Sequence, residues 1–453
     1  MKIKAVILGA GQGTRMKSSK PKVLHQLFSK PLIEYPILAV QGAGAEEICV
    51  IVGHKAEEVQ KEVGSKASYR LQTEQLGTGH AVMQALDFIE DEGHTIVLYG
   101  DTPLITAKTL SNMKNYHLEN DYSGTVLSAM VDDPTGYGRI IKDVHGSFLG
   151  IVEQKDASKD ELLINEINGG MYIFKSALLK DALSKLTNNN AQNEYYFTDV
   201  IDIIRNNGGK IATYIAQDSE EILGVNSKIQ LAQATNIMKH RINTNHMENG
   251  VIIIDPDQTY IEPEVVIGSD TTIEPGCMLK GATEIGEECV IGYNSKISNS
   301  IILSYTHIES SVILDSKVGE HTHVGPFAYI RPNSTIGSYV KVGDFVEIKN
   351  ATLGDNTKVS HLTYIGDADV GKNVNFGCGT VVVNYDGKNK HRSTIEDNAF
   401  IGCNTNLVSP VTVEANAYTA AGSTITKNVP ENALGVARAK QINVEDWVTR
   451  KGR

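Results

Sequence analysis

The sequence contains little that would cross-link the chain or anchor it in a membrane. Its five cysteines are widely spaced and include no CxxC pair, which argues against a disulfide scaffold and against a zinc site built on paired thiolates. No apolar run reaches the roughly 18 residues of a membrane span, and the first apolar run is too short for a signal peptide. We therefore expect a reduced, cytoplasmic protein that does not insert into membranes.

Positive charge is also scarce. Among 453 residues, 42 Lys and Arg stand against 54 Asp and Glu, which gives a formal net charge of −12. The chain thus lacks the basic surface that a general nucleic-acid binder needs to displace counterions. With 41% apolar and 21% charged residues it is not disordered in bulk. We expect small-molecule substrates and no nucleic acid, since a few local cations suffice to hold a phosphate.

The first half of the chain alternates apolar runs with helical segments. The runs cover residues 4–8, 47–52 and 95–99, and the helical segments cover 57–63 and 79–90. This alternation predicts an α/β domain with a mostly parallel sheet. Ligands of such sheets bind beyond the carboxyl ends of the strands. The loops to consider are therefore those at Gly9, Gly53 and Gly100.

The second half carries runs in which every sixth residue is apolar, with single-residue slips between some of the runs. One uninterrupted run is Ile261, Ile267, Ile273, Leu279, Ile285, Ile291 and Ile297. Neither the α-helical period of 3.6 nor the strand period of 2 produces this pattern, whereas a parallel β-helix does, because each hexapeptide forms one side and turns one corner. Three sides make a coil of 18 residues, so we expect roughly nine coils.

Two segments interrupt these patterns. Residues 226–248 contain no Gly or Pro and predict a connecting helix of roughly 30 Å. We therefore divide the chain into domains 1–225 and 249–453, joined by this linker, with a tail after the last hexad.

The polar residues 383–392 interrupt the hexads before Ile395, and such insertions leave a solenoid as loops on one face, commonly the binding face.

A glycine-rich turn, residues 9–16, follows the first apolar run. It is not a dinucleotide-binding GxGxxG, because Thr14 replaces the final Gly, and it is not a P-loop, because no Lys-Ser/Thr pair closes it. We expect the turn to open into a helix and its N–H groups to bind phosphate, aided by Arg15 and Lys22. The alternative is a structural turn with two solvated cations.

The strings around this turn resemble the motifs of sugar-phosphate nucleotidyltransferases. They are LGAGQGTRM at 8–16 with Pro21-Lys22, LQTEQLGTGHA at 71–81, YGDTPL at 99–104, GYGR at 136–139, Val152-Glu153, Asn168-Gly169 and GVN at 224–226. Combined with the hexapeptide half, the whole chain resembles the bacterial bifunctional enzymes that are both N-acetylglucosamine-1-phosphate uridyltransferases and glucosamine-1-phosphate acetyltransferases. That resemblance implies a Rossmann-like nucleotidyltransferase domain, a long helix and a left-handed parallel β-helix.

For residues 1–225 the resemblance implies a uridyltransferase site. Arg15 and Lys22 would be catalytic by holding the triphosphate, and Asp101 with Asn226 would hold Mg²⁺. The residues implied in binding UTP or the UDP-sugar are Leu8, Gly11, Gln72, Gly77, Thr78, Tyr99, Gly100, Gly138, Glu153, Asn168 and Asn226. A protein base is unnecessary, because the attacking phosphate oxygen is already ionised. The alternative for Asp101 is a turn before Thr102-Pro103.

For the second half the resemblance implies an acetyltransferase site. Transfer to an amine needs a base, and His361, in the segment HLTYIG, would serve. The residues implied in binding the glucosamine phosphate are Arg331, Lys349, Tyr364, Asn375 and Lys390. The residues implied in binding acetyl-CoA are Asn384, Tyr385, Cys403, Ala421 and Arg438. His321 and His323 form an HxH without a third ligand, so we predict no metal there.

Two positions depart from the family's usual residues. Gly9 replaces Ala, which we expect to loosen the turn and to alter the base pocket slightly. Cys403 replaces the frequent Ser, and a thiol is a weaker donor toward acetyl-CoA. The alternative is that Cys403 only packs.

Three functions remain open. The first is a homotrimeric two-site enzyme that acetylates glucosamine 1-phosphate with acetyl-CoA and then uses UTP to make UDP-N-acetylglucosamine, a cell-wall precursor. The second is a nucleotidyltransferase for another sugar phosphate with a non-catalytic β-helix. The third is a regulatory homologue with two inactive sites. His361, Lys349 and the insertion favour the first over the second, while Arg15, Lys22 and Asp101 disfavour the third.

Overall fold

The computed structural model describes residues 2–190 and 192–452. It divides into two compact units, Met1–Met238 and Lys239–Arg453. Helix α7 (Lys228–Glu248) runs through this division, in the segment for which the sequence predicts a helix. The domain boundaries at 225 and 249 remain a prediction. No helix in the described ranges is both long and apolar enough to cross a membrane.

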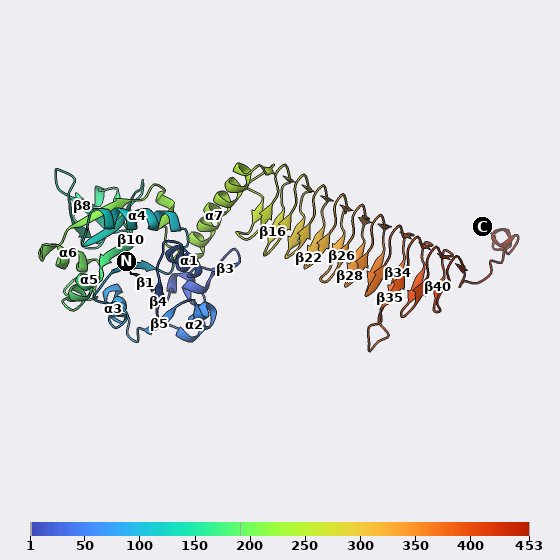
Figure 1. The fold of residues 1–453 in the computed structure, drawn as a ribbon, viewed down its shortest axis with the longest axis horizontal. Coiled ribbons are helices and arrows are strands. Elements are labelled where there is room, and N and C mark those ends of the chain that lie inside the picture. The colour runs from blue at the N-terminus through green and yellow to red at the C-terminus, as the bar shows by residue number, and fades with distance from the viewer. Residues whose placement is uncertain (1, 191, 453) are drawn as a thin grey trace. The chain divides into compact units, whose positions relative to one another are not determined.

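The first unit is built on a nine-stranded mixed sheet with the order β11-β7-β10-β6-β1-β4-β5; β8 pairs with β10, and β9 with β8 (Figure 1). Its strands are β1 (Ile3–Leu8), β4 (Glu47–Val52), β5 (Ser68–Leu71), β6 (His94–Tyr99), β7 (Gly124–Met130), β8 (Arg139–Lys142), β9 (Phe148–Val152), β10 (Glu166–Lys175) and β11 (Ile211–Ile215). The three predicted strands are β1, β4 and β6, and they pair in parallel at its centre. Burial on both faces explains their continuous apolar runs.

Helices cover this sheet and connect its strands. They are α1 (Glu34–Gly42), α2 (Ala56–Val63), α3 (Thr78–Met83), α4 (Ala107–Glu119), α5 (Ser176–Leu183) and α6 (Asp199–Asn206). The predicted helix at 57–63 is confirmed as α2. The helix predicted at 79–90 is too long, because α3 ends at Met83 and the chain continues in tight turns. Those turns place Phe88 and Ile89 in the core, so tertiary packing overrides the local helical tendency.

The glycine-rich turn after β1 does not open into an α-helix, and that prediction is wrong. Only a single 3-10 turn follows, at Thr14–Met16. Gly13 and Lys17 flank it with φ of 63° and 46°, and left-handed residues at both ends prevent an α-helical ladder from extending. A phosphate here would therefore meet turn N–H groups and cations rather than a helix N-terminus.

The second unit is a parallel β-helix whose coils each contribute one strand to three sheets of 11, 10 and 9 strands (Figure 1). The first sheet holds β12 (Ile252–Ile253), β15 (Thr272–Ile273), β18 (Val290–Ile291), β21 (His307–Ile308), β24 (His323–Val324), β27 (Lys341–Asp344), β30 (Lys358–His361), β33 (Asn375–Phe376), β36 (Phe400–Ile401), β39 (Tyr418–Thr419) and β41 (Leu434–Gly435). The second holds β13 (Tyr260–Ile261), β16 (Met278–Lys280), β19 (Lys296–Ser298), β22 (Val312–Leu314), β25 (Tyr329–Ile330), β28 (Glu347–Lys349), β31 (Tyr364–Gly366), β34 (Val381–Val383), β37 (Asn406–Val408) and β40 (Thr424–Ile425). The third holds β14 (Val266–Ile267), β17 (Glu284–Ile285), β20 (Ile301–Ile302), β23 (Lys317–Val318), β26 (Thr335–Ile336), β29 (Thr352–Leu353), β32 (Ala368–Val370), β35 (Ser393–Ile395) and β38 (Thr412–Val413).

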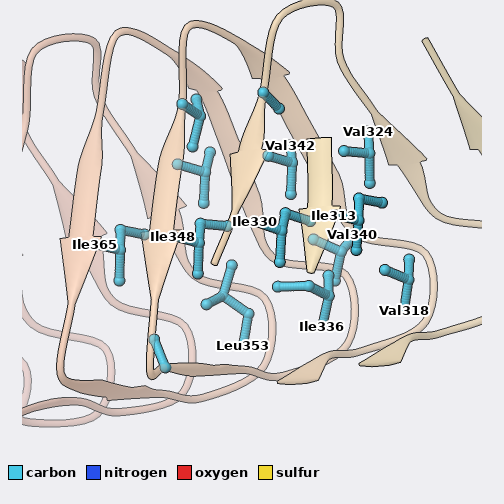
Figure 2. Packing of buried hydrophobic residues seen from close by; sticks show 14 of the residues in the cluster. Ile313, Val318, Val324, Ile330, Ile336, Val340, Val342, Ile348, Leu353 and Ile365 are labelled. Atoms are coloured by element: carbon cyan, nitrogen blue, oxygen red, sulfur yellow. The ribbon is translucent and has the colours of Figure 1, made fainter. Parts of the chain in front are cut away.

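The register of these strands confirms the hexapeptide prediction. Ile261 lies opposite Leu279, and Leu279 opposite Ile297, so one coil takes 18 residues. Figure 2 shows the inward side chains in rows along the coils, and Val324, Ile330 and others are fully buried. Each coil turns at corners with positive φ. We call the turn between the first and second sheets, which contains Leu362 (φ 44°), the first corner, and the turn between the second and third sheets, which contains Asp367 (φ 50°), the second corner.

The insertion leaves the β-helix between β34 and β35, as predicted. A bridge between Tyr385 and Lys390 closes it, and the carboxylate of Asp386 accepts the N–H groups of Lys388 (2.7 Å) and Asn389 (2.6 Å). After the last coil the chain ends in an exposed tail with the short helix α8 (Trp447–Arg450).

Candidate functional sites

A cavity of about 700 Å³ lies at the carboxyl ends of β1 and β6 in the first unit. Every residue predicted to act in this half lines it except Gly100. Gly100 lies behind the wall, where its N–H donates to the carbonyl of Leu8 at 2.9 Å. A Cβ at position 100 would lie 3.1 Å from that carbonyl oxygen, so the residue supports the close approach of β6 to β1.

Three polar side chains converge within this cavity. The Lys22 ammonium donates to Asp101 Oδ2 and to Asn226 Oδ1, the latter at 3.0 Å. The Asp101 carbonyl accepts the N–H of Val225 at 2.8 Å, which fastens the segment before Asn226 to the end of β6. The Lys22 and Asp101 side chains are 15% and 13% exposed. These charges are therefore largely shielded from water. Electrostatic interactions are stronger in such a shielded site than in water.

The residues present fit the implied Mg²⁺. Asp101 Oδ2 and Asn226 Oδ1 both face one ammonium, so the two oxygens converge on a common point. Mg²⁺ is typically held by one or two protein oxygens, with phosphates and water completing the shell. The described ranges contain no group of three or more His, Cys, Asp or Glu that could hold a metal, so a site made entirely of such side chains is not present there.

Two glycines shape the turn beside these groups. Gly13 has φ of 63°, and a Cβ on it would lie 2.5 Å from Lys22 Cβ, so only glycine lets the lysine approach. Gly9 is firmly held, because its N–H donates to the Ile51 carbonyl at 2.8 Å. A methyl at position 9 would lie 3.2 Å from Ile33 Cδ1. Glycine therefore avoids a tight contact at this position, and the loosening expected from the sequence stays a prediction.

Gly138, Glu153 and Asn168 form a second polar group in the cavity. The Asn168 N–H donates to the Gly138 carbonyl at 2.9 Å, and its side-chain amide donates to the Tyr172 hydroxyl at 2.7 Å. A Cβ on Gly138 would lie 3.5 Å from Glu153 Oε2, so glycine keeps the carboxylate accessible. Burial raises the pKa of Glu153. Partly buried carboxyl and amide groups that face a cavity suit the hydroxyl groups of a sugar.

Tyr99, Gln72, Gly77 and Thr78 complete the predicted lining. Burial raises the pKa of Tyr99 well above its ordinary value, so the phenol remains a neutral hydrogen-bond group. The Gln72 side chain is only 3% exposed and donates to the Gly77 carbonyl at 3.1 Å. Thr78 Oγ1 accepts the N–H of Phe197 at 3.1 Å. These fixed amides and carbonyls form a wall able to read the edge of a base.

Several further lining residues were not among the predicted site residues, and they include the polar side chains of Gln75, Tyr137, Glu194 and Gln230. Gln75 and Tyr137 lie inside strings already singled out, so their motifs contained the signal. Gln230 belongs to the first turns of α7, where its side-chain oxygen accepts the N–H of Asn226 at 2.9 Å. The sequence around Gln230 contains no motif that predicts a binding role, because the segment 226–248 predicts only a helix.

In the second unit a cationic cluster lies beside the second corner. Lys349 donates to Asp367 Oδ2 at 3.3 Å, and Asn384 donates to the same oxygen. Asn384 also donates to the Tyr364 hydroxyl at 3.3 Å. A hydrogen bond with Lys349, followed by its positive charge, lowers the pKa of Lys390, with a smaller effect of the same sign from Arg331. Cations grouped so closely suit a phosphate.

His361 lies at the first corner, away from this cluster. It ends β30, and its Nδ1 is 2.6 Å from Asp344 Oδ1 on β27. This hydrogen bond lowers the pKa of Asp344. Asp344 was not predicted, although it precedes His361 by 17 residues, close to one coil. Asn375 begins β33 on the next coil of the same sheet, opposite Lys358.

The residues predicted to bind acetyl-CoA fall into two groups. Asn384 and Tyr385 accompany the cationic cluster. Cys403 and Ala421 each lie directly before a positive-φ residue of the first corner, as His361 does. The three residues therefore lie in one row along the first corner, on successive parts of the β-helix. A Cβ on Gly422 would lie 4.0 Å from Arg438 Cδ, which places Arg438 at the end of that row.

Three family models match the chain. Residues 4–257 match the nucleotidyl transferase family, residues 261–331 the GMPPB C-terminal domain, and residues 315–350 the bacterial transferase hexapeptide family of six repeats. The hexapeptide match and the three parallel sheets together identify the second unit as a left-handed β-helix.

Several relatives align with nearly the whole of this chain. A protein of Acetivibrio thermocellus named "Bifunctional protein GlmU" is 54% identical over 449 residues, which is 99% of this chain and 97% of the relative. Proteins of the same name from Clostridioides difficile strain 630 and Clostridium perfringens strain SM101 are 53% and 55% identical. These alignments cover 100% and 99% of this chain and 99% and 98% of the two relatives.

Proposed function

The chain belongs to the GlmU family of bifunctional enzymes, with a nucleotidyltransferase and a hexapeptide acetyltransferase domain, and we propose that the residues named above divide the two reactions between its units. The β-helix would acetylate the amine of glucosamine 1-phosphate. The first unit would then transfer the uridylyl group of UTP to the acetylated sugar and release pyrophosphate. The convergence of Lys22, Asp101 and Asn226 inside a cavity that Glu153 and Asn168 also line carries this proposal.

For uridylyl transfer the chain supplies position and charge. Lys22 is held by its two partners where phosphates would enter, and Arg15 lines the same cavity. Glu153 and Asn168 would orient the sugar so that its phosphate oxygen faces the α-phosphorus in line with the departing pyrophosphate. Asp101 and Asn226 would hold Mg²⁺, which when bound neutralises phosphate charge.

For acetyl transfer the chain supplies a base and a phosphate anchor. The cationic cluster of Arg331, Lys349 and Lys390 would hold the sugar phosphate. The amine nitrogen attacks the thioester carbonyl, a carbon–nitrogen bond forms and the carbon–sulfur bond breaks. His361 Nε2 accepts the proton that the nitrogen loses and returns it to the departing thiolate.

We further propose that three copies associate through the β-helix. His361 and the cationic cluster lie at different corners, so a neighbouring copy would bring one copy's histidine to another copy's cations. At the first corner Phe327, Phe345 and Leu362 are 55%, 59% and 57% exposed, and the two phenyl rings stack at 5.4 Å. An apolar ridge of this kind favours burial in an interface. Light scattering should give three times the chain mass of 49.2 kDa.

The five free cysteines, three of them buried, support the proposed cytoplasmic location, where thiols stay reduced.

The decisive experiment supplies purified protein with glucosamine 1-phosphate, acetyl-CoA, UTP and Mg²⁺, and records free thiol and pyrophosphate separately. We expect thiol release first, and no pyrophosphate when acetyl-CoA is omitted. EDTA should stop pyrophosphate release and spare thiol release. Pyrophosphate from N-acetylglucosamine 1-phosphate without any thiol release would instead indicate a nucleotidyltransferase with a non-catalytic β-helix.

A further inference from the structure

Asp344 is a carboxylate to which neither proposed reaction assigns a role. It ends β27, and the parallel ladder places it opposite His361. Its Oδ1 lies 2.6 Å from His361 Nδ1, a short distance even for a charge-assisted hydrogen bond. The two side chains are 38% and 58% exposed, so the imidazole can reach substrate while it keeps this partner.

The backbone fixes both members of the pair. The N–H of Leu362 donates to the Asp344 carbonyl at 3.0 Å, and Thr363 Oγ1 donates to the His361 carbonyl at 2.7 Å. His361 is therefore held by the main chain that follows it and by its ring through Asp344. A ring held in this way presents its remaining nitrogen, Nε2, in one direction.

The charge of Asp344 fixes the proton on the ring. The hydrogen bond from His361, and to a smaller extent the charge of Lys341 on the same strand, lower the pKa of Asp344. Lys358 on β30 lies opposite Lys341 in register and adds a second cation to this sheet. The carboxylate thus stays ionised near neutral pH and can only accept a hydrogen bond. Nδ1 must then carry the proton, and Nε2 of the neutral ring is an acceptor.

We propose that Asp344 is a positioning residue for acetyl transfer, which holds His361 in the tautomer whose Nε2 takes the amine proton. This inference rests on the proposed acetyltransferase function of His361. During the reaction one proton moves from the substrate nitrogen to Nε2. The Nδ1 proton remains on the ring, and the nearby anion stabilises the imidazolium that forms.

The test compares Asp344→Ala, Asp344→Asn and the matched control Asp315→Asn in the full-length protein. Asp315 is an exposed carboxylate at the second corner that accepts from Asn299 at 3.2 Å. For Asp344→Ala we expect kcat of thiol release to fall about 10- to 100-fold, the range found when the hydrogen-bonded partner that orients a metal-ligating histidine is lost. KM for acetyl-CoA and uridylyl transfer should stay within about twofold of wild type, because Asp344 is not among the residues proposed to bind acetyl-CoA or UTP.

Asp344→Asn separates geometry from charge. Its amide oxygen still accepts from Nδ1, so we expect a smaller loss of kcat than in Asp344→Ala. Because the anion is gone, the acid limb of the kcat/KM profile should move to lower pH. Asp315→Asn should change neither kcat nor the profile.

Unchanged kcat and an unchanged pH profile in both Asp344 variants would overturn the inference. If Asp344→Ala also loses uridylyl transfer through misfolding, Asp344→Asn decides, since it preserves shape. The absence of thiol release from the wild-type protein would overturn the proposed function itself, and it is measured before any variant is made.

Discussion

The two units differ in how they shield their candidate sites. In the first unit Lys22 and Asp101 are 15% and 13% exposed, whereas in the second His361 and Asp344 are 58% and 38% exposed. An α/β sheet can surround a cavity with the loops that leave its strands. A β-helix fills its interior with apolar side chains, so its polar groups lie on outer corners. The first site is closed by its own chain, and the second needs another surface to exclude water.

The largest expected effect tests whether the two sites act independently, and it comes from removing the His361 side chain. In His361→Ala we expect acetyl transfer to fall about 10²- to 10⁴-fold, the usual contribution of a general base, while uridylyl transfer is unchanged. Thiol release and pyrophosphate release, assayed on the same preparation, measure the two effects. His307→Ala, an exposed histidine of the same sheet, is the matched control and should keep both activities. Equal loss of both activities would contradict separate sites.

The reverse experiment removes the carboxylate of the closed cavity. In Asp101→Ala we expect uridylyl transfer to fall about 10²- to 10³-fold, since one preorganised charged group is lost from a shielded site, and acetyl transfer to persist. Pyrophosphate release at rising Mg²⁺ concentration is the measurement, and excess metal should recover part of the rate. Asp121→Ala, which removes a surface carboxylate paired with Lys175, is the control. A normal rate in Asp101→Ala would leave the metal proposal without support.

These contrasts also show why one half could be predicted more fully than the other. In the β-helix, neighbours in space follow from a fixed interval in sequence, so the burial of Ile261 and Ile330 follows from the period alone. The same interval, shortened by one residue, contains the pairing of Asp344 with His361. It does not contain the positions of Lys349 and Lys390, because the second of these lies in an insertion that breaks the period.

In the first unit no interval relates the residues that meet. Lys22, Asp101 and Asn226 come from three distant segments, and the resemblance of their motifs, rather than any periodicity, placed them together. The 3-10 turn after Gly13 and the early end of α3 were missed because each depends on tertiary packing. Strand positions were predictable because runs buried on both faces must be continuously apolar.

Gly13 offers a smaller, purely geometric perturbation of the closed site. In Gly13→Ala the new Cβ would lie 2.5 Å from Lys22 Cβ, so we expect the lysine to shift and kcat of uridylyl transfer to fall about tenfold. The backbone strain should cost about 1–2 kcal/mol of unfolding free energy. Gly146→Ala is the matched control, because its φ is also positive, at 82°, but no atom lies within 4 Å of its Cβ. If the two variants have the same kcat of uridylyl transfer, the contact between the new Cβ and Lys22 does not explain the loss of activity, and backbone strain alone does.

The smallest effect distinguishes the units by their response to acid. In the first unit His117 is fully buried, with its Nε2 2.9 Å from His94 Nδ1 and its Nδ1 2.8 Å from Thr125 Oγ1. Burial lowers the pKa of His117 from 6.5 to about 3. Below pH 6.5 the His117 imidazole binds a proton in the unfolded chain but stays neutral in the folded one. The contribution of His117 to the unfolding free energy is therefore fully favourable above pH 6.5 and declines as the pH falls toward 3.

Between pH 6.5 and 5.5 this group alone should lower the unfolding free energy of the first unit by about 1 kcal/mol. Urea titrations of the full-length protein at the two pH values, followed through loss of uridylyl transfer, measure it. His117→Gln removes the titrating ring and should flatten this dependence even though it lowers stability at both pH values. His145→Gln, on an exposed turn, should leave the dependence intact. An equally steep decline in His117→Gln would assign the acid sensitivity to other groups, and the buried imidazole would then not distinguish the closed unit from the open one.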